Sequence, residues 1–369
     1  MSKKFILVSP KNRTVYNFRG DLIAEIKRKG YEVIVTGPNT DNLEQIKTLG
    51  VRFYEIPMNK TGINIFSDIK YLLALRKLFK EERPDAMLGY TVKPVIYGAI
   101  AAKMARVANI NSMITGVGYL FVSKTMKARI LRALARILYI IGLKCADHVI
   151  FQNRDDLDEF ISNGLVKRSK CHVVNGSGVN MAKYTVTSFP DRMTFFMLSR
   201  ALISKGVREY FKAAKIVKDR YRENVRFMFL GAIENMPDSI SKEELEPYIE
   251  DGIIDYFGES KNVSEYFDQC SVFVLPSYRE GTPRTVLEAM SKGRPIITTD
   301  APGCRSTVLE GQNGYLVPVG NIEKLVEKME CFIEHPEFVE KMGRASYELC
   351  KDRFEVDKVN AAMIRIMNL

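Results

Sequence analysis

The chain has 369 residues, of which 46% are hydrophobic and 27% charged, a length that is comfortable for two domains and long for one core. No window approaches 18 uncharged apolar residues, which excludes a membrane-spanning helix. The apolar run in the opening stretch, MSKKFILVSPKNR, is too short to predict a signal peptide. The six cysteines lack C-x-x-C spacing, so we expect a reducing, cytoplasmic compartment and no zinc site.

The formal net charge of +11 is distributed unevenly along the chain. Residues 1–187 hold 30 Lys or Arg against 15 Asp or Glu, whereas residues 188–369 hold 25 against 29. A basic half suggests an anionic partner, either a membrane or a nucleic acid. A solvated surface that favours Lys and Arg explains the charge equally well.

Short apolar runs alternate with helical periodicity along most of the chain. In the first half, strands are predicted at residues 4–9, 31–37, 51–57, 85–90, 111–116, 147–152 and 171–176. A polar, irregular stretch at residues 177–192 is predicted to be a linker. The pattern then restarts, with strands predicted at residues 193–199, 226–231, 253–258, 271–277 and 294–300. Strands that alternate with helices predict parallel sheets covered on both faces.

We therefore expect an α/β protein of two Rossmann-like, doubly wound parallel-sheet domains facing a cleft. The predicted domains are residues 1–187 and 188–352, and residues 353–369 are predicted to form a helix that returns to the first domain. In open α/β sheets, ligands bind outside the carboxyl ends of the strands. The chemistry is therefore expected in the cleft.

The segment EGTPRTVLEAMSKGRP predicts a short helix that begins just after Glu280. Thr282 is a favoured N-cap, Pro283 suits the first helical position, and Gly293 suits the end. A helix dipole explains a carboxylate at Glu280, but its effect fades after the first turn and does not explain Glu288. A glutamate at that position can accept two hydrogen bonds from a vicinal diol, such as that of a ribose. The free N–H groups at the start of the helix favour phosphate.

A pair of cations follows the first strand of the second half. The sequence LSRALISKGVREY places Arg200 and Lys205 at the carboxyl end of the strand predicted at residues 193–199. One forked and one compact cation can clamp a diphosphate. Taken alone, each of these patterns also arises by chance or in solvated side chains.

Together, and in this order, the segments resemble the retaining glycosyltransferases of the GT-B fold, group 4, over nearly the whole chain. LSRALISKG, LPSYREGTPRTVLEAMSKGRPIITTDAPGC and GQNGYLVPVGN carry the resemblance. It implies that Glu280 and Glu288 form the family's E-x7-E pair, with Glu288 on the ribose and Glu280 on the donor sugar. It implies that Arg200 and Lys205 hold the diphosphate, and with Glu280 these are the expected catalytic residues. The other residues implied to bind the nucleotide sugar are Gly258, Gly281, Thr282, Pro283 and Arg284.

The N-terminal half resembles the branch of this group that extends undecaprenyl-diphosphate-linked sugars, including α-1,3-N-acetylgalactosaminyltransferases. YNFRGDLI, GYTVKPVIYGAIAAK and TGVGYLF carry this resemblance. It implies that Arg19, Thr91, Lys93 and Thr115 face the acceptor or the donor phosphates, although an ordinary loop or surface role stays open for each. The favoured donor is UDP-GalNAc, with UDP-GlcNAc, UDP-glucose and UDP-galactose close behind.

The expected activity is sugar transfer with retention, without a metal or other cofactor. The leaving diphosphate oxygen takes the acceptor proton while cations stabilise the departing charge. One feature departs from the family pattern, because many relatives place a histidine near the donor sugar. Here His148 and His172 lie in predicted strands, and neither they nor His335 matches that position.

The pair Asp156-x-Asp158 follows a predicted strand, as the metal-binding D-x-D motif of GT-A transferases does. The alternative, which we favour, is that Asn153 caps a helix whose first turn is stabilised by acidic residues. No metal ligand is therefore predicted.

Residues 124–144 predict an amphipathic helix. Its periodicity gathers Met126, Ile130, Leu134, Ile137, Leu138 and Ile141 on one side, with Arg129, Arg132 and Arg136 opposite. An ordinary domain helix would bury the apolar stripe and leave the arginines in water. We favour contact between the arginines and anionic lipid headgroups, because a polyprenyl-linked acceptor requires peripheral association with the inner face of the cell membrane.

Two other functions stay open. A GT-B sugar-nucleotide epimerase fits the fold but matches the flanking motifs less well. A non-enzymatic nucleic-acid-binding protein explains the basic half, but it leaves the glutamate pair and the Arg200 and Lys205 pair unexplained. The sequence has no aromatic-interleaved RNP-like motif, so we expect no nucleic-acid partner.

Overall fold

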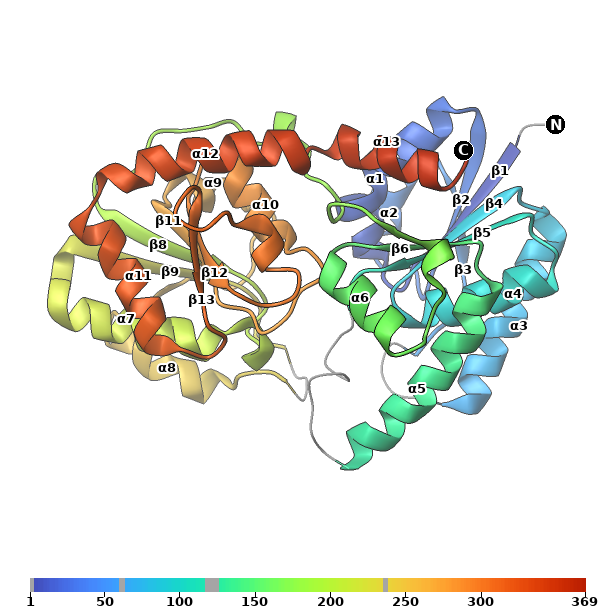
Figure 1. Ribbon diagram of the computed structural model, residues 1–369, viewed down its shortest axis with the longest axis horizontal. Helices are drawn as coiled ribbons and strands as arrows, with labels where there is room; N and C mark the ends of the chain where they lie inside the picture. Colours follow the sequence, from blue (N-terminus) through green and yellow to red (C-terminus); the bar gives the residue numbers. More distant parts are fainter. Residues whose placement is uncertain (1–2, 60–63, 117–125, 235–237) are drawn as a thin grey trace. The chain divides into compact units, whose positions relative to one another are not determined.

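Two parallel β-sheets organise the chain, each in a unit of its own (Figure 1). The computed structural model describes residues 3–59, 64–116, 126–234 and 238–369. One unit comprises Met1–Ser177 together with Val356–Leu369, and the other comprises Gly178–Glu355.

The sheet of the first unit has seven strands in the order β3-β2-β1-β4-β5-β6-β7, and every neighbouring pair is parallel. The strands are β1 (Lys3–Val8), β2 (Tyr31–Gly37), β3 (Arg52–Glu55), β4 (Ala86–Tyr90), β5 (Asn109–Ile114), β6 (His148–Phe151) and β7 (Cys171–Val173). Parallel strands need crossover helices, which cover both faces of the sheet. Those helices are α1 (Asn12–Arg28), α2 (Leu43–Lys47), α3 (Ile65–Glu82), α4 (Ala99–Met104), α5 (Met126–Cys145) and α6 (Arg154–Ser162), with a π-helical turn η1 (Pro94–Gly98) before α4.

Alternating side chains of β1 divide the core of this unit into two layers. Ile6 and Val8 belong to one buried cluster, and Phe5 and Leu7 belong to the other. The first cluster includes side chains of α3, η1, α4, α5 and α6, and the second includes side chains of α1. The period of two along a strand therefore decides which helix each residue meets.

The end of the chain completes the first unit. Helix α13 (Val356–Ile366) joins the cluster that α1 lines, through Val359, Met363 and Ile364. The carbonyl of Met367 accepts a hydrogen bond of 2.5 Å from the Asn109 amide. Three apolar side chains at helical spacing bury this short helix, since propensity alone rarely stabilises one of its length.

The sheet of the second unit has six parallel strands in the order β10-β9-β8-β11-β12-β13. They are β8 (Met193–Leu198), β9 (Val225–Leu230), β10 (Asp255–Tyr256), β11 (Val272–Leu275), β12 (Ile296–Thr299) and β13 (Gly314–Val317). The helices are α7 (Val207–Tyr221), α8 (Lys242–Glu250), α9 (Ser264–Asp268), α10 (Arg284–Ser291), α11 (Ile322–Glu334) and α12 (Glu337–Arg353), with a 3-10 turn η5 (Ile203–Lys205) before α7. One continuous hydrophobic cluster forms the core.

All twelve predicted strands overlap observed strands, and the predicted α/β class with two parallel sheets is confirmed. Strand β13 was not predicted. It is four residues long and begins at Gly314, whose φ of 152° is available to glycine. A Cβ there would lie 1.8 Å from the carbonyl oxygen of Ile296, so glycine is required where β13 meets β12. Glycine has a low strand propensity, which explains why β13 was not predicted.

The stretch predicted as a linker belongs to the second unit, and the division of the chain lies ten residues before the predicted boundary. Buried Arg294 explains why. Its guanidinium donates to the carbonyl oxygens of Phe267 at 3.1 Å, Thr187 at 3.2 Å and Ser188 at 3.2 Å. The same group lies 4.5 Å above the ring of Phe189. Side-chain contacts such as those of Arg294, rather than a ladder of strand hydrogen bonds, therefore hold the irregular segment.

Replacing Arg294 by methionine is expected to lower the free energy of unfolding by about 3 kcal/mol, because several buried carbonyl groups lose their donor. Urea titration followed by circular dichroism measures the change. Arg220→Met is the matched control. Arg220 is 57% exposed in its pair with Glu330, and exposed ion pairs contribute at most about 1 kcal/mol. Equal losses in the two variants would contradict the role given to Arg294.

Candidate functional site

The strand order of the second unit locates a ligand-binding edge. From β8 the chain moves outward to β9 and β10, and it then returns to the other side of β8 with β11, β12 and β13. The loops that leave β8 and β11 therefore diverge, and in sheets of this kind ligands bind in the crevice at this point. Arg200 and Lys205 lie in the first loop and Glu280 lies in the second.

A glycine turn joins the two loops. Gly206 has a φ of 74°, and a Cβ there would lie 2.1 Å from the carbonyl oxygen of Pro276. The Tyr278 N–H also donates to the Ser204 carbonyl at 2.9 Å. Only a residue without a side chain fits this close approach, and the contact fixes Lys205 beside the end of β11.

Lys205 and Glu280 form the centre of the site. The Lys205 ammonium is ion-paired with Oε1 of Glu280, and the Ser277 hydroxyl donates to the same oxygen at 2.8 Å. The two charged side chains are 21% and 13% exposed. A half-buried ammonium beside a carboxylate can bind phosphate oxygens on one side and sugar hydroxyls on the other. Ser277 belongs to the quoted LPS sequence, but nothing in the sequence singled it out.

The loop after β12 packs against the backbone of Glu280. The Glu280 N–H donates to the Pro302 carbonyl at 3.0 Å. Gly303 has a φ of 78°, and a Cβ there would lie 2.2 Å from the Glu280 carbonyl oxygen and 2.5 Å from that of Gly281. This packing fixes the Glu280–Gly281 turn in front of helix α10.

Arg200 has a different partner from Lys205. It follows β8, as predicted, and its Nη1 lies 3.1 Å from Oε2 of Glu234. Its side chain is 49% exposed. The structure thus places both cations at the same edge of the sheet but gives them separate carboxylates, so the predicted clamp stays a prediction.

Helix α10 begins one residue later than predicted. The N-cap residue is Pro283 rather than Thr282, because its extended ψ of 109° keeps it outside the helix. Its carbonyl accepts from the N–H groups of Val286 at 3.1 Å and Leu287 at 3.3 Å. The predicted end is confirmed, since Gly293 has a φ of 70° and its N–H donates to the Met290 carbonyl at 2.9 Å.

Glu288 lies in the second turn of α10 and is largely buried. Nε of Arg284 donates to its Oε1 at 3.1 Å, and Arg284 also donates to the Gly178 carbonyl. The Tyr184 hydroxyl forms a further hydrogen bond with this carboxylate. Burial raises the pKa of Glu288, although Arg284 and Tyr184 oppose the shift. Sequence reasoning missed Tyr184, which lies in the presumed linker and carries no motif.

The raised pKa of Glu288 predicts a pH-dependent stability. The folded chain protonates this carboxyl at a higher pH than the unfolded chain does, so the stabilisation is present at low pH and is lost as the pH rises through the folded-state pKa. Glu288→Gln, which keeps the shape without the charge, should gain stability relative to the wild type between pH 5 and pH 7.5. Urea unfolding at both pH values tests this, and parallel curves would contradict it.

Gly258, the residue implied to line the base pocket, follows β10. Its φ is 65°, and its carbonyl accepts from the Gly231 N–H at 2.7 Å. The Tyr256 hydroxyl donates to the Gly231 carbonyl at 3.0 Å. The ends of β9 and β10 are thus tied together at the same edge of the sheet as Lys205 and Glu280.

The four acceptor-side residues predicted in the first unit have different surroundings. Thr91 and Thr115 follow the neighbouring strands β4 and β5, and Thr91 has a φ of 67°. Arg19 is buried on α1, with its guanidinium carbon 5.1 Å from the centre of the Tyr90 ring. Residues 117–121 of the quoted TGVGYLF lie outside the part of the chain that the structure describes.

Lys93 is engaged inside the first unit. Its ammonium lies 2.6 Å from Oδ1 of Asp68, whose Oδ2 accepts from the Tyr97 hydroxyl at 3.1 Å. Lys93 is 8% exposed and Asp68 is 3% exposed. A buried pair of this kind leaves an uncompensated charge when either partner is removed. The structure therefore gives Lys93 a structural contact that the sequence did not predict.

Asp156 and Asp158, which follow β6, lie at the start of helix α6. Asn153 caps this helix, as the favoured alternative predicts. The Asn153 side chain accepts from the Asp156 N–H at 2.8 Å and donates to the Asp156 carboxylate at 3.0 Å. Asp156 is buried, whereas Asp158 is exposed and lies 3.6 Å from Arg168. The two carboxylates therefore have separate environments.

His148 and His172 form a half-buried pair. Nδ1 of His148 lies 3.2 Å from Nε2 of His172, across β6 and β7. Burial, and then the neighbouring imidazole, lowers the pKa of His172. This supports the packed role expected for both residues.

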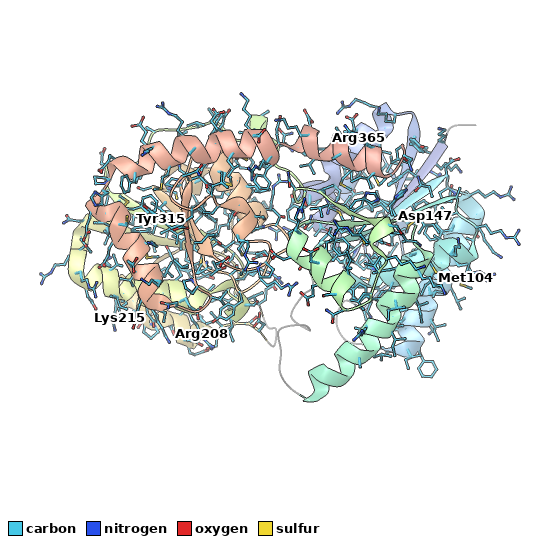
Figure 2. All side chains as sticks on the ribbon, in the orientation of Figure 1. Met104, Asp147, Arg208, Lys215, Tyr315 and Arg365 are labelled. Atoms are coloured by element: carbon cyan, nitrogen blue, oxygen red, sulfur yellow. The ribbon has the colours of Figure 1, made fainter. Side chains whose placement is uncertain are left out.

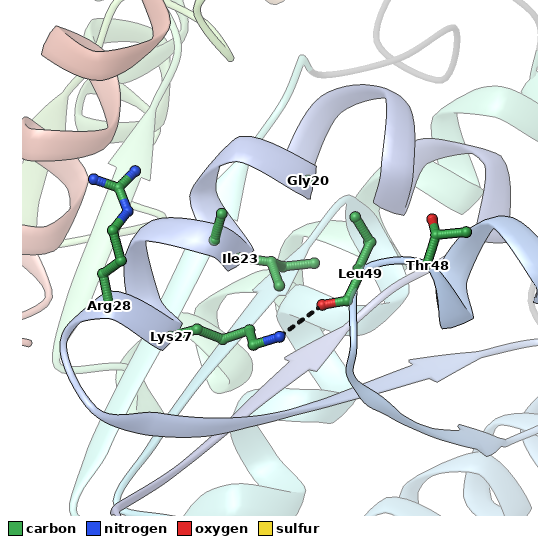
Figure 3. A pocket seen from close by; sticks show the side chains of 7 residues that line it. Gly20, Ile23, Lys27, Arg28, Thr48 and Leu49 are labelled. Atoms are coloured by element: carbon green, nitrogen blue, oxygen red, sulfur yellow. Dashed lines mark hydrogen bonds between the residues drawn. The ribbon is translucent and has the colours of Figure 1, made fainter.

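A pocket in the first unit lies away from these residues (Figure 3). Gly20, Ile23, Lys27 and Leu49 are among the residues that line it, and Lys27 Nζ donates to the Leu49 carbonyl at 2.9 Å. It lies along the second half of α1, a helix that starts at the carboxyl edge of the sheet and runs towards the opposite edge. The pocket therefore does not lie at the carboxyl ends of the strands, where an open parallel sheet is expected to bind its ligand.

Helix α5 does not follow the alternative of an ordinary domain helix that buries its whole apolar stripe. Leu134, Ile137 and Ile141 are exposed, whereas Tyr139 and Leu143 are buried. Of the three predicted membrane arginines, Arg136 is exposed and donates to the Asn163 carbonyl at 2.5 Å. The side chains of Arg129 and Arg132 lie outside the part that the structure describes. Among the described helices, none is both long and apolar enough to cross a bilayer.

Two family models match the chain, one in each unit. The glycosyl transferase 4-like family matches residues 4–153, and the family Glycosyl transferases group 1 matches residues 185–349. These ranges lie within the first and second units, and the second contains Arg200, Lys205, Gly258, Glu280 and Glu288.

Two curated relatives cover most of the chain. The N,N'-diacetylbacillosaminyl-diphospho-undecaprenol alpha-1,3-N-acetylgalactosaminyltransferase of Campylobacter jejuni is 27% identical over 335 residues, which is 87% of each chain. The UDP-Gal:alpha-D-GlcNAc-diphosphoundecaprenol alpha-1,3-galactosyltransferase of Escherichia coli is 25% identical over 307 residues, which is 80% of this chain and 77% of that one.

Solved structures share the fold at lower identity. A glycosyltransferase from Rickettsia africae has a TM-score of 0.79 at 18% identity and covers 99% of this chain and 98% of its own. HepE from Anabaena, solved in complex with UDP, has a TM-score of 0.79 at 16% identity and covers both chains fully. The chain is therefore a glycosyltransferase of the GT-B fold, with a domain of the glycosyl transferase 4-like family in its first unit and a domain of the family Glycosyl transferases group 1 in its second.

Proposed function

We propose that this glycosyltransferase moves a sugar, with GalNAc the first choice, from a UDP-sugar to a polyprenyl-diphosphate-linked glycan acceptor in surface glycan synthesis. The observation that carries the proposal is the cluster of Lys205, Glu280 and Ser277 at the carboxyl edge of β8 and β11. The second unit binds the donor in this proposal, and the first unit binds the acceptor.

The donor site follows from the chemistry of each group. A diphosphate needs cations and N–H donors, which Lys205, Arg200 and the start of α10 supply. A ribose diol needs an acceptor of two hydrogen bonds, and we assign this role to the carboxylate of Glu288, which Arg284 and Tyr184 hold in place. UDP is bound to the Anabaena protein of the same fold, which supports a uridine nucleotide here.

The reaction needs neither a strong protein base nor a metal in this proposal. The acceptor hydroxyl attacks the anomeric carbon on the face that the diphosphate leaves, and the leaving oxygen takes the acceptor proton. Lys205 and Arg200 stabilise the negative charge that develops on the diphosphate. Glu280 orients the donor sugar through its hydroxyl groups. The configuration of the anomeric carbon is therefore retained.

The acceptor assignment rests on the relatives. The Campylobacter and Escherichia proteins are named for sugars linked to undecaprenol diphosphate, and each aligns with at least 80% of this chain. An acceptor anchored in a bilayer requires the enzyme to work at the membrane surface. We therefore place the protein in the cytoplasm, peripherally associated with the anionic inner face of the cell membrane.

A donor panel tests the proposal. UDP-GalNAc, UDP-GlcNAc, UDP-galactose and UDP-glucose are each incubated with undecaprenyl-diphosphate-linked sugars, with and without EDTA, and the products are analysed by mass spectrometry and NMR. We expect an α-linked product that also forms in EDTA. A β-linked product would overturn retention, and turnover that needs added Mn²⁺ would overturn metal independence. Nucleic-acid binding without sugar transfer would refute the proposal as a whole.

A further inference from the structure

Helix α3 exposes apolar side chains at its N-terminal end. Ile65 is 63% exposed, Phe66 is 82% exposed, Ile69 is 50% exposed and Leu73 is 48% exposed. On the opposite side of the same helix, Tyr71, Leu75, Leu78 and Phe79 are buried in the core. Helix α3 thus carries apolar side chains on its exposed side as well as its buried side, which a helix that only covers a sheet does not need.

Helix α5 has the same property. Ile137 is 55% exposed, Ile141 is 47% exposed, and Leu134 and Ile140 are each 38% exposed. Eight of the thirteen large hydrophobic side chains that are exposed among the described residues lie on these two helices. Single exposed apolar residues need no explanation, but a concentration of this size marks an interaction surface. We call these eight side chains the apolar face.

The two helices share one side of the first unit. Buried side chains of α3 and of α5 belong to the same cluster on the same face of the sheet. Each helix follows a parallel strand, so both begin at the carboxyl edge (Figure 1). Thr91 and Thr115, the proposed acceptor-side residues, follow strands that end at this edge. The α3 part of the apolar face therefore lies at the edge where the acceptor is proposed to bind, and the α5 part lies further along its helix on the same side of the sheet.

The charges that α3 and α5 carry around the apolar face are mainly positive, and the exposed carboxylate of Glu81, near the end of α3, lies 3.8 Å from Lys77. Asp68, the one acidic residue between Ile65 and Lys80, is buried in its pair with Lys93. Lys70 and Lys77 are exposed on α3. The sequence of α5 contains no acidic residue and five basic ones. Exposed Ile, Leu and Phe among mostly basic side chains suit the layer between anionic headgroups and acyl chains.

We propose that the apolar face of α3 and α5 inserts into the interfacial layer of an anionic bilayer. The inference rests on the proposed function, because a lipid-linked acceptor gives the enzyme a reason to contact that layer. It differs from the expectation that arginines of α5 bind headgroups, since the isoleucines, leucines and phenylalanine enter the acyl region. The basic residues then contribute long-range attraction to the surface, which salt screens.

Single-tryptophan variants test the insertion directly, because the chain contains no tryptophan. Phe66→Trp and Ile137→Trp report from the two helices. Met104→Trp is the matched control, since Met104 is 47% exposed on the same unit but ends α4, at the opposite edge of the sheet (Figure 2). Each full-length variant is mixed with vesicles of phosphatidylcholine and phosphatidylglycerol that carry brominated acyl chains.

We expect the emission of F66W and I137W to shift to shorter wavelength and to be quenched at least twofold by brominated chains, and M104W to stay unchanged. Phe66→Ser combined with Ile69→Ser should weaken vesicle binding by at least about tenfold, given the hydrophobic transfer energy of two such side chains. Val319→Ser, in the second unit, should leave it unchanged. Equal quenching at all three tryptophans, or none at Phe66 and Ile137, would overturn the proposal. A dimer that the double serine variant dissociates, without vesicle binding, would assign the face to a second copy instead.

An acceptor with a short, water-soluble prenyl chain separates this inference from the proposed function. The double serine variant should use that acceptor as well as the wild type does and should lose activity only on vesicles that contain the long-chain acceptor. Equal activity of variant and wild type on vesicles overturns the insertion but leaves the transferase intact. No transfer by the wild type to either acceptor overturns the proposed function, whatever the vesicle binding shows.

Discussion

Lys205→Ala is expected to lower kcat for sugar transfer by about 100-fold while changing the KM for the donor by less than about fivefold. Removing one donor that stabilises charge developing in a transition state typically costs this much in kcat. The Lys205 ammonium lies against Glu280 at the carboxyl edge of β8, and we propose that it opposes the charge on the departing diphosphate. Initial rates at saturating donor and acceptor measure the effect.

Two further variants make the test specific. Lys215→Ala removes an exposed lysine of α7 in the same unit (Figure 2) and should leave kcat within about twofold. Glu280→Gln, alone and combined with Lys205→Ala, completes a double-mutant cycle. The cycle separates the catalytic effect of the lysine from the effect of losing its ion pair. A Lys205 variant that is folded and turns over at the wild-type rate would remove this residue from the mechanism.

Glu288→Ala is expected to weaken UDP binding by about 30-fold with little change in kcat. Two hydrogen bonds between a carboxylate and a diol contribute on the order of 2 kcal/mol in net free energy, and they are the same in the ground state and the transition state. Calorimetry with UDP gives the dissociation constant. Glu327→Ala, on the exposed side of α11, is the matched control and should not change it.

A ligand lacking one hydroxyl shows whether the ribose is the partner of Glu288. UDP and 2′-deoxy-UDP should differ in affinity for the wild type, and the difference should vanish in Glu288→Ala. If the variant still discriminates between the two ligands by the wild-type factor, Glu288 acts on α10 packing through Arg284 and Tyr184 rather than on the nucleotide. Unchanged UDP affinity would contradict the assignment outright.

Local sequence was enough to predict most of the fold. The strands were identifiable because parallel strands buried on both faces are nearly continuous apolar runs, as in FILV of β1 and VFVL of β11. The end of α10 was identifiable because Gly293 requires a positive φ. The segment 177–192 is irregular, as predicted, but composition did not show that Arg294, more than 100 residues away, holds part of it.

For the candidate site too, the sequence predicted some features and the structure alone revealed others. The motifs that contain Arg200, Lys205, Glu280 and Glu288 carried the resemblance to the family, and the resemblance implied the roles proposed for these residues. Their partners were not predictable. Lys205 meets Glu280 only because β8 and β11 are neighbours in the sheet and Gly206 allows the loops to touch. Arg200 meets Glu234 across 34 residues, and Lys93 is buried by Asp68 from another helix.

The sequence by itself determined which segments become strands and helices and which family the chain resembles, and it singled out the side chains that we propose bind an activated sugar. Only the tertiary structure decided which charges neutralise one another and which face of α5 is exposed. The physical reason is the distance along the chain over which each kind of interaction acts. Periodicity, capping and turn preferences act over a few residues, whereas ion pairs and burial depend on strands and helices that the chain brings together from positions far apart.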